Sequence, residues 1–184
     1  MHKSEEHVKS SLISKFEEAD MRIPLHVLDS IEVLNCICVV ISSDTDVIVT
    51  LLYHMKRFLN QGLKELWVRA GVGDTSRYIP IHVLHDRMGG DLCSVLPAVH
   101  SLTGCDITSK VGTNKSALKA HPEKVLKQFG VLPTLTSANV RDAEQYLVMV
   151  LRPKSEAVNF SEMRVETFHF TKSMSHQNLP PTSN

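Results

Sequence analysis

The feature that most constrains the fold is a nearly continuous apolar run from Val33 to Ile41, followed directly by Ser42-Ser43-Asp44-Thr45-Asp46. The run is rich in β-branched residues and predicts a strand buried on both faces, as in parallel sheets covered by helices. The polar residues after it favour helix N-caps, and they predict a helix from about Val47 to Gln61 that Gly62 ends. A buried strand followed by a helix is the repeating unit of α/β folds.

The remaining sequence alternates between short apolar segments and amphipathic segments. These patterns predict strands over Leu66–Ala70 and Arg77–Val83, and helices over Ser10–Ser30, Leu92–Leu102, Lys115–Phe129 and a segment capped by Ser137 in which Val140, Ala143, Leu147 and Val150 share a face. Pro24 is expected to kink or break the first helix. We therefore expect an α/β domain over residues 1–151, with an open, mainly parallel sheet flanked by helices. Residues 152–184 are expected to form an irregular, largely disordered tail.

The charge balance excludes a general attraction to nucleic acid. Lys plus Arg number 20 and Asp plus Glu number 20, so any such binding requires a local patch. The apolar runs are too short to span a bilayer, and the first residues do not resemble a signal peptide. We expect an intracellular protein, nuclear or cytoplasmic, with no membrane partner. The four cysteines lack zinc-site spacing and are interpreted as reduced structural thiols.

Three groups of carboxylates fall at informative places on this map. They are Glu17-Glu18-Ala19-Asp20 in the first predicted helix, Asp44 and Asp46 after the buried strand, and Asp106 after Gly104. Ligands of open α/β sheets bind outside the carboxyl ends of the strands, where Asp44 is expected. Carboxylates that converge there would repel one another unless a hard divalent cation such as Mg²⁺ or Mn²⁺ lay between them. Such a site suits phosphodiester hydrolysis.

Each group also has a purely structural interpretation. Asp44 and Asp46 can be the N-cap and first-turn acids of the following helix, and Asp106 can be a turn residue. Glu18 and Asp20 are two residues apart, so they share a site only if they straddle a helix start. Glu17 with Asp20 is the alternative pairing within a helix, and the acids of that helix can simply be solvated.

The order of these motifs resembles the flap-endonuclease and XPG-type nucleases, a branch of the PIN-like fold. Glu-Glu-Ala-Asp, then Ser-Asp-Thr-Asp after an apolar strand, then Thr-Gly-Cys-Asp follow one another within about Phe16 to Phe129. The pattern is closer still to transposon-associated proteins that carry Glu-Glu-Ala-Asp, Asp-Thr-Asp and Gly-Cys-Asp motifs. The resemblance implies a Rossmann-like, PIN-like α/β fold.

The resemblance also implies roles for individual residues. Glu18, Asp20, Asp44, Asp46 and Asp106 look like metal ligands, and Asp44, Asp46 and Asp106 look catalytic; together they would hold two Mg²⁺ or Mn²⁺ ions if the site is complete. Residues 111–115 match the place of a basic turn that grips the DNA backbone, so Lys110, Lys115 and Lys119 are candidate nucleic-acid-binding residues. A solvated helix face is the alternative interpretation of these lysines. The implied partner is nucleic acid, DNA before RNA.

The sequence departs from this family before Glu17, where the family's first strand has no counterpart. We therefore expect a sheet that is incomplete at its amino end. Two hypotheses stay open: a metal-dependent endonuclease or 5′ exonuclease, and an inactive, transposon-derived remnant that acts as a nucleic-acid or protein binding module. A nucleotide-binding domain is disfavoured because Gly71-x-Gly73 lacks the third glycine of that motif.

Overall fold

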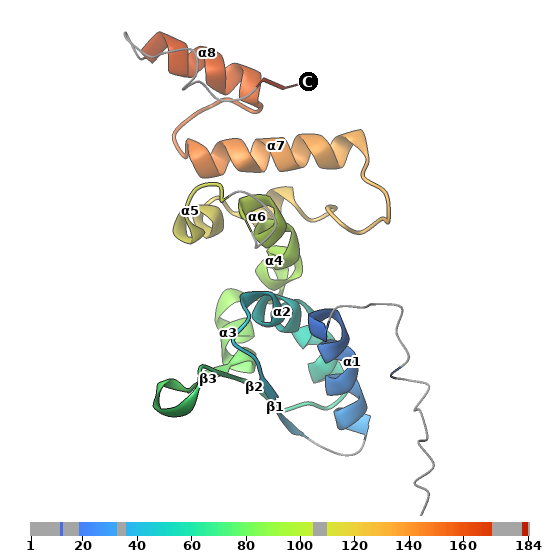
Figure 1. Ribbon diagram of the computed structural model, residues 1–184. Helices are drawn as coiled ribbons and strands as arrows, with labels where there is room; N and C mark the ends of the chain where they lie inside the picture. Colours follow the sequence, from blue (N-terminus) through green and yellow to red (C-terminus); the bar gives the residue numbers. More distant parts are fainter. Residues whose placement is uncertain (1–11, 13–18, 33–35, 105–109, 171–181, 184) are drawn as a thin grey trace, which may run out of the picture. The chain divides into compact units, whose positions relative to one another are not determined.

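The computed structural model describes residues 12, 19–32, 36–104, 110–170 and 182–183. The chain divides into two compact units, residues 1–93 and residues 94–184, with the boundary inside helix α4 (Gly90–Thr103) (Figure 1). The described part is α/β, with several helices and one small mixed sheet. No helix in these ranges has the length and apolar character needed to cross a membrane.

The first unit builds a three-stranded sheet from neighbouring segments of the chain. Its elements are α1 (Ala19–Glu32), β1 (Ile37–Ile41), α2 (Thr45–Asn60), β2 (Glu65–Ala70), β3 (Arg77–Pro80) and α3 (Ile81–Met88). The strand order is β1-β2-β3, with β1 parallel to β2 and β2 antiparallel to β3. The sheet is therefore mixed rather than mainly parallel, because the short Gly71–Ser76 connection permits only an antiparallel return.

The core of this unit lies on one face of the sheet. Leu66 and Val68 of β2 and Leu51, Met55 and Phe58 of α2 have 0% exposure. In Figure 1 the helices α1, α2 and α3 gather on one side of the strands. The helices of this unit therefore supply a single covering layer.

Three further expectations for the first unit are wrong. The strand expected over Arg77–Val83 ends at Pro80, because α3 begins at Ile81 and includes Val83. The strand Ile37–Ile41 is not buried on both faces: the side chains of Ile37, Val39 and Ile41 are 58%, 52% and 74% exposed. The reason is that helices cover only the opposite face of the sheet, and β1 lies at its edge. Pro24 also does not break its helix, since α1 continues from Ala19 to Glu32 with Pro24 buried inside it. Packing of α1 against α2 offsets the hydrogen bond that proline removes.

The second unit is helical. Besides the end of α4 it contains α5 (Asn114–Lys119), α6 (Pro122–Val125), α7 (Ser137–Leu151) and α8 (Phe160–Phe170). The expected single helix over 115–129 is instead two short ones, because His121 adopts a left-handed conformation (φ 50°) and Pro122 restarts the chain as a first helical residue. Phe160–Phe170 forms α8 inside the segment expected to be irregular, and Met163 packs there on Val148 and Ala157.

The helix α7 organises the second unit through one buried tyrosine. Thr136, rather than Ser137, caps the helix by accepting a hydrogen bond from the Asn139 backbone N–H at 3.2 Å. Val140, expected on the buried face, is 55% exposed, whereas Tyr146 has 0% exposure. The Tyr146 hydroxyl donates to the backbone carbonyl of Ala117 at 3.1 Å, so it joins α7 to α5.

Replacing Tyr146 with phenylalanine is expected to cost about 0.5–1.5 kcal/mol, because the Ala117 carbonyl loses its donor. Burial raises the pKa of Tyr146 to about 12, above the ordinary value of about 10. The folded state therefore disfavours the phenolate, and this tyrosine's contribution is complete below about pH 10 and is lost as the pH rises from 10 through 12. Tyr146→Phe should therefore remove this contribution to the fall in the free energy of unfolding between about pH 10 and pH 12.

Urea unfolding followed by far-UV circular dichroism at neutral and alkaline pH measures both effects. Tyr53→Phe, at an exposed tyrosine of α2, is the matched control and should leave the free energy of unfolding at neutral pH unchanged. The prediction is contradicted if the free energy of unfolding of Tyr146→Phe falls with alkaline pH as steeply as that of the unsubstituted protein.

Candidate functional site

The loop between β1 and α2 is tied to the carboxyl end of β2. The Ser42 N–H donates to the Arg69 carbonyl at 3.2 Å, and the Ser43 Oγ accepts from the Gly71 N–H at 3.0 Å. Gly71 has a φ of 87°, and a Cβ there would lie 2.7 Å from the Thr75 carbonyl oxygen, so glycine is required. The carboxyl ends of the two parallel strands therefore lie side by side, with the acidic loop at that edge.

Asp44 is the N-cap of α2. Its backbone is extended (φ −82°, ψ 135°), and its Oδ1 accepts from the Asp46 N–H at 2.9 Å. The Asp44 N–H in turn donates to the Ser42 Oγ at 3.1 Å. The capping role expected as an alternative is thus present. Capping uses only one acceptor position of the Asp44 carboxylate, because an ionised aspartate has two oxygens and about four acceptor positions.

Asp46 lies in the first turn of the same helix and is half-buried. The structure therefore brings Asp44 and Asp46 together, at the carboxyl end of β1 and the N-terminus of α2. Helix N-termini favour negative charge, which stabilises two neighbouring carboxylates at this position.

The other predicted metal ligands are not gathered around this pair within the described residues. Asp20 lies in the first turn of α1, and its Oδ1 accepts from the Met21 N–H at 3.0 Å. Glu18 and Asp106 fall outside the described residues. Among residues 19–32, 36–104 and 110–170, no group of three or more His, Cys, Asp or Glu side chains has a metal-binding arrangement. The five-carboxylate site stays a prediction.

The acid pair fits one mode of divalent-metal binding. Mg²⁺ is commonly held by one or two carboxylates, several waters and the phosphates of a substrate, rather than by a cage of protein ligands. Asp44 is exposed and Asp46 is half-buried at this edge. Each supplies carboxylate oxygens, which are the hard donors that Mg²⁺ and Mn²⁺ prefer.

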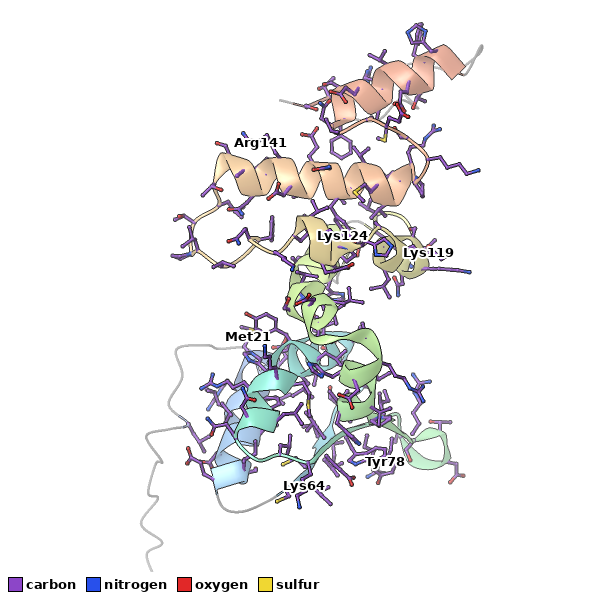
Figure 2. The ribbon with its side chains drawn as sticks, turned by 180° about the vertical axis from the view of Figure 1, so that it is seen from behind. Met21, Lys64, Tyr78, Lys119, Lys124 and Arg141 are labelled. Atoms are coloured by element: carbon purple, nitrogen blue, oxygen red, sulfur yellow. The ribbon has the colours of Figure 1, made fainter. Side chains whose placement is uncertain are left out.

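In the second unit, two of the three candidate lysines line one groove. The groove has a volume of about 500 Å³, and its cationic or ionisable lining residues are Lys115, Lys119, His121 and Arg152. Figure 2 shows the Lys119 side chain extending from α5. Lys110 is exposed and does not line this groove. Three permanent cations on one concave surface form a local basic patch in a chain of zero net charge.

The groove depends on close packing of α5 against α7. Gly112 has a φ of 69°, and a Cβ there would lie 2.6 Å from a Val150 methyl carbon, so the turn before α5 approaches α7 closely. The Thr113 Oγ1 then caps α5 by accepting from the Ser116 N–H at 3.1 Å. These contacts fix both lysine-bearing turns beside the end of α7.

The sequence patterns did not identify Arg152 and His121 as candidate site residues. Arg152 directly follows the last apolar residue of α7, where a basic residue favours the helix C-terminus, and that signal was available. What the sequence does not show is the packing that places it beside lysines more than thirty positions earlier. His121 also lines the groove, and its backbone is left-handed (φ 50°).

The cysteines in the described ranges differ in burial: Cys36 is exposed, Cys38 is half-buried and Cys93 is buried. Cys36, Cys38 and Cys93 are free thiols, and Cys105 lies outside these ranges. Burial raises the pKa of Cys38 and of Cys93, which keeps both thiols protonated and weakly nucleophilic.

Comparison of the chain with protein-family models, curated proteins and solved structures finds no match.

Proposed function

We propose that this chain is a divalent-metal-dependent phosphodiesterase that acts on nucleic acid, with a PIN-like, flap-endonuclease-like domain. The observation that carries the proposal is the Asp44–Asp46 pair at the carboxyl end of β1, where β1 runs parallel to β2. Open α/β sheets bind their ligands at this edge. Asp44 is exposed and Asp46, two residues later, is half-buried at this edge, which agrees with the strand-end acid pair that the motif resemblance implies.

In this proposal Asp44 and Asp46 would hold Mg²⁺ or Mn²⁺ through their carboxylate oxygens and so fix its position at this edge of the sheet. The ion supplies Lewis-acid stabilisation of phosphate charge and lowers the pKa of its bound water. By the resemblance, Asp106 is the third catalytic acid, and Glu18 and Asp20 complete a two-ion site.

The basic groove supplies the second requirement, which is affinity for the phosphate backbone. Lys115, Lys119 and Arg152 line a concave surface of about 500 Å³. Arg and Lys contacts to phosphates dominate nucleic-acid affinity and carry no sequence preference. Nucleic acid, DNA before RNA, is therefore the proposed partner.

Cleavage of labelled single-stranded DNA and 5′-flap DNA in Mn²⁺ tests the proposal. We expect products with Mn²⁺ and none with excess chelator. Absence of cleavage by folded protein with either substrate would overturn the enzymatic assignment.

A second candidate, nucleic-acid binding without hydrolysis by a transposon-derived remnant, is favoured by the groove itself. Its cations belong to a unit that contains neither Asp44 nor Asp46, so their affinity for phosphate does not require the acid pair. Metal-independent binding without cleavage would identify this function.

Replacing Lys115, Lys119 and Arg152 together with glutamine is expected to weaken oligonucleotide binding. For single strands the slope of log affinity against log salt should become less steep by about 2, because each lost phosphate contact contributes about 0.7. Fluorescence anisotropy over a salt series measures this. The control replaces three exposed cations of the first unit, Lys56, Lys64 and Arg87, and it should bind normally. Equal salt slopes for the two triple variants would contradict the role of the groove.

A further inference from the structure

One face of the three-stranded sheet is apolar and open. The strand registers pair Ile37 with Glu65, Val39 with Trp67 and Ile41 with Arg69, and they also pair Arg69 with Tyr78. Side chains of paired residues lie on the same face of a sheet. Trp67 is also paired with Pro80, so the open sheet face consists of Ile37, Val39, Ile41, Glu65, Trp67, Arg69, Tyr78 and Pro80.

The two faces of the sheet differ sharply in exposure. On the covered face, Leu66 and Val68 have 0% exposure. On the open sheet face, Ile37, Val39 and Ile41 are all more than half exposed, and Tyr78 is 58% exposed. Tyr78, on β3, is labelled in Figure 2. A contiguous apolar surface of this kind, with polar residues at its rim, marks a site of protein association.

The aromatic residue at the centre of the face is held in a fixed orientation. The Trp67 Nε1–H donates to the Glu65 Oε2 at 2.8 Å, and the ring packs edge-on against the His82 ring with centroids 5.2 Å apart. A half-buried tryptophan with its polar atom already bonded loses little side-chain freedom on association. Trp and Tyr are enriched at the centres of protein interfaces for this reason.

We propose that the open sheet face binds a second copy of this chain, face to face, about a two-fold axis that lies across the strands. Rotation about that axis reverses the strand direction and preserves the strand order. Val39 then faces Val39 of the second copy, and Ile37 faces Ile41. Packed sheets lie about 10 Å apart with strands within about 30° of alignment, so these side chains interdigitate.

Charge complementarity identifies the occupant and its orientation. Glu65 and Arg69 occupy opposite ends of β2 on the open sheet face, beside Ile37 and Ile41 respectively. The two-fold axis across the strands places Glu65 opposite Arg69 of the second copy, and by symmetry this pair forms twice. An axis along the strands would place Glu65 opposite Glu65 and Arg69 opposite Arg69, which like-charge repulsion disfavours. The face is thus self-complementary in one arrangement.

Sedimentation velocity of the full chain over a concentration series tests the proposal, with a thiol reductant present because Cys36 and Cys38 are free. We expect a reversible monomer–dimer equilibrium. Val39→Glu puts two carboxylates face to face and should lower the association constant about a hundredfold. The control Val72→Glu, at a residue that is 84% exposed and outside the open sheet face, should dimerise normally.

Charge exchange separates this interface from any other mode of dimerisation. Glu65→Arg and Arg69→Glu should each weaken the dimer, and the double variant should restore it because the opposite charges again face each other. The Trp67–Glu65 hydrogen bond is lost in both Glu65→Arg variants, so its loss cannot account for the recovery. A chain that stays monomeric at every concentration overturns the proposal, as does a dimer that Val39→Glu leaves intact or a double variant that fails to recover.

Discussion

Replacing Phe58 with alanine is expected to lower the free energy of unfolding of the first unit by about 3–5 kcal/mol. Phe58 has 0% exposure and lies on the face of α2 that also buries Leu51 and Met55. Its backbone carbonyl accepts from the Leu63 N–H at 3.1 Å, in the turn that leads from α2 into β2. Truncating this ring leaves a cavity at the point where helix and sheet meet, and the rigid turn beside it limits collapse. A loss of this size approaches the whole stability of a small unit.

Leu59→Ala is the matched control, since Leu59 is the next residue of the same helix and is 39% exposed. It should cost much less, because little apolar surface is withdrawn from water there. Urea unfolding followed by the fluorescence of Trp67, the chain's one tryptophan, reports on the first unit directly. If the Phe58→Ala and Leu59→Ala variants unfold at the same urea concentration, Phe58 is not part of the core.

The elements that the sequence predicted well are those with a local signal. The helix after Asp44 was expected to start near Val47 and to end at Gly62, and α2 spans Thr45–Asn60. The strand predicted over Leu66–Ala70 is β2, Glu65–Ala70. The capping aspartate, the apolar periodicity and the terminating glycine are all signals within one continuous segment, Asp44 to Gly62, so no tertiary information was needed.

The wrong expectations concern what covers each element. The residues of β1 are apolar on both faces, and a pattern of this kind cannot distinguish a strand covered on two faces from one covered on a single face. The expected helix over Lys115–Phe129 is divided into α5 and α6 at His121, whose left-handed backbone has no signal in the sequence pattern. Long-range packing also decides that Arg152 joins Lys115 and Lys119 in one groove.

The candidate site was predictable only in the part that has a local sequence signal. Asp44 and Asp46 are two residues apart at the junction of a strand and a helix, so local rules alone placed them at the sheet edge. The expected convergence with Glu18, Asp20 and Asp106 needs segments distant in the sequence to meet. Single-sequence reasoning cannot supply that geometry, and the proposal therefore depends on the acid pair.

Replacing Asp44 and Asp46 together with asparagine is expected to reduce Mn²⁺-dependent cleavage by about a thousandfold or more. Metal-ion stabilisation contributes several kcal/mol to such reactions, and each 1.36 kcal/mol is a factor of ten. The fold should survive, because asparagine is as good an N-cap as aspartate and can still accept from the backbone N–H of residue 46. The lost first-turn charge at Asp46 costs only about 0.3–1 kcal/mol. We therefore expect this variant to lose cleavage activity while its free energy of unfolding changes little.

The control for lost charge is Asp86→Asn with Asp91→Asn, which removes two exposed carboxylates of the same unit that belong to α3 and α4 rather than to the loops at the carboxyl ends of β1 and β2. It should cleave normally. Mn²⁺ binding, measured from the electron paramagnetic resonance signal of the free ion, gives a readout independent of turnover and should weaken only in the Asp44/Asp46 variant. Full cleavage by the Asp44/Asp46 variant would show that neither residue belongs to the catalytic site. Normal Mn²⁺ binding with lost cleavage would instead keep them catalytic and place the ion on other ligands, because a carboxylate pair that holds no metal can act only on the water or the substrate.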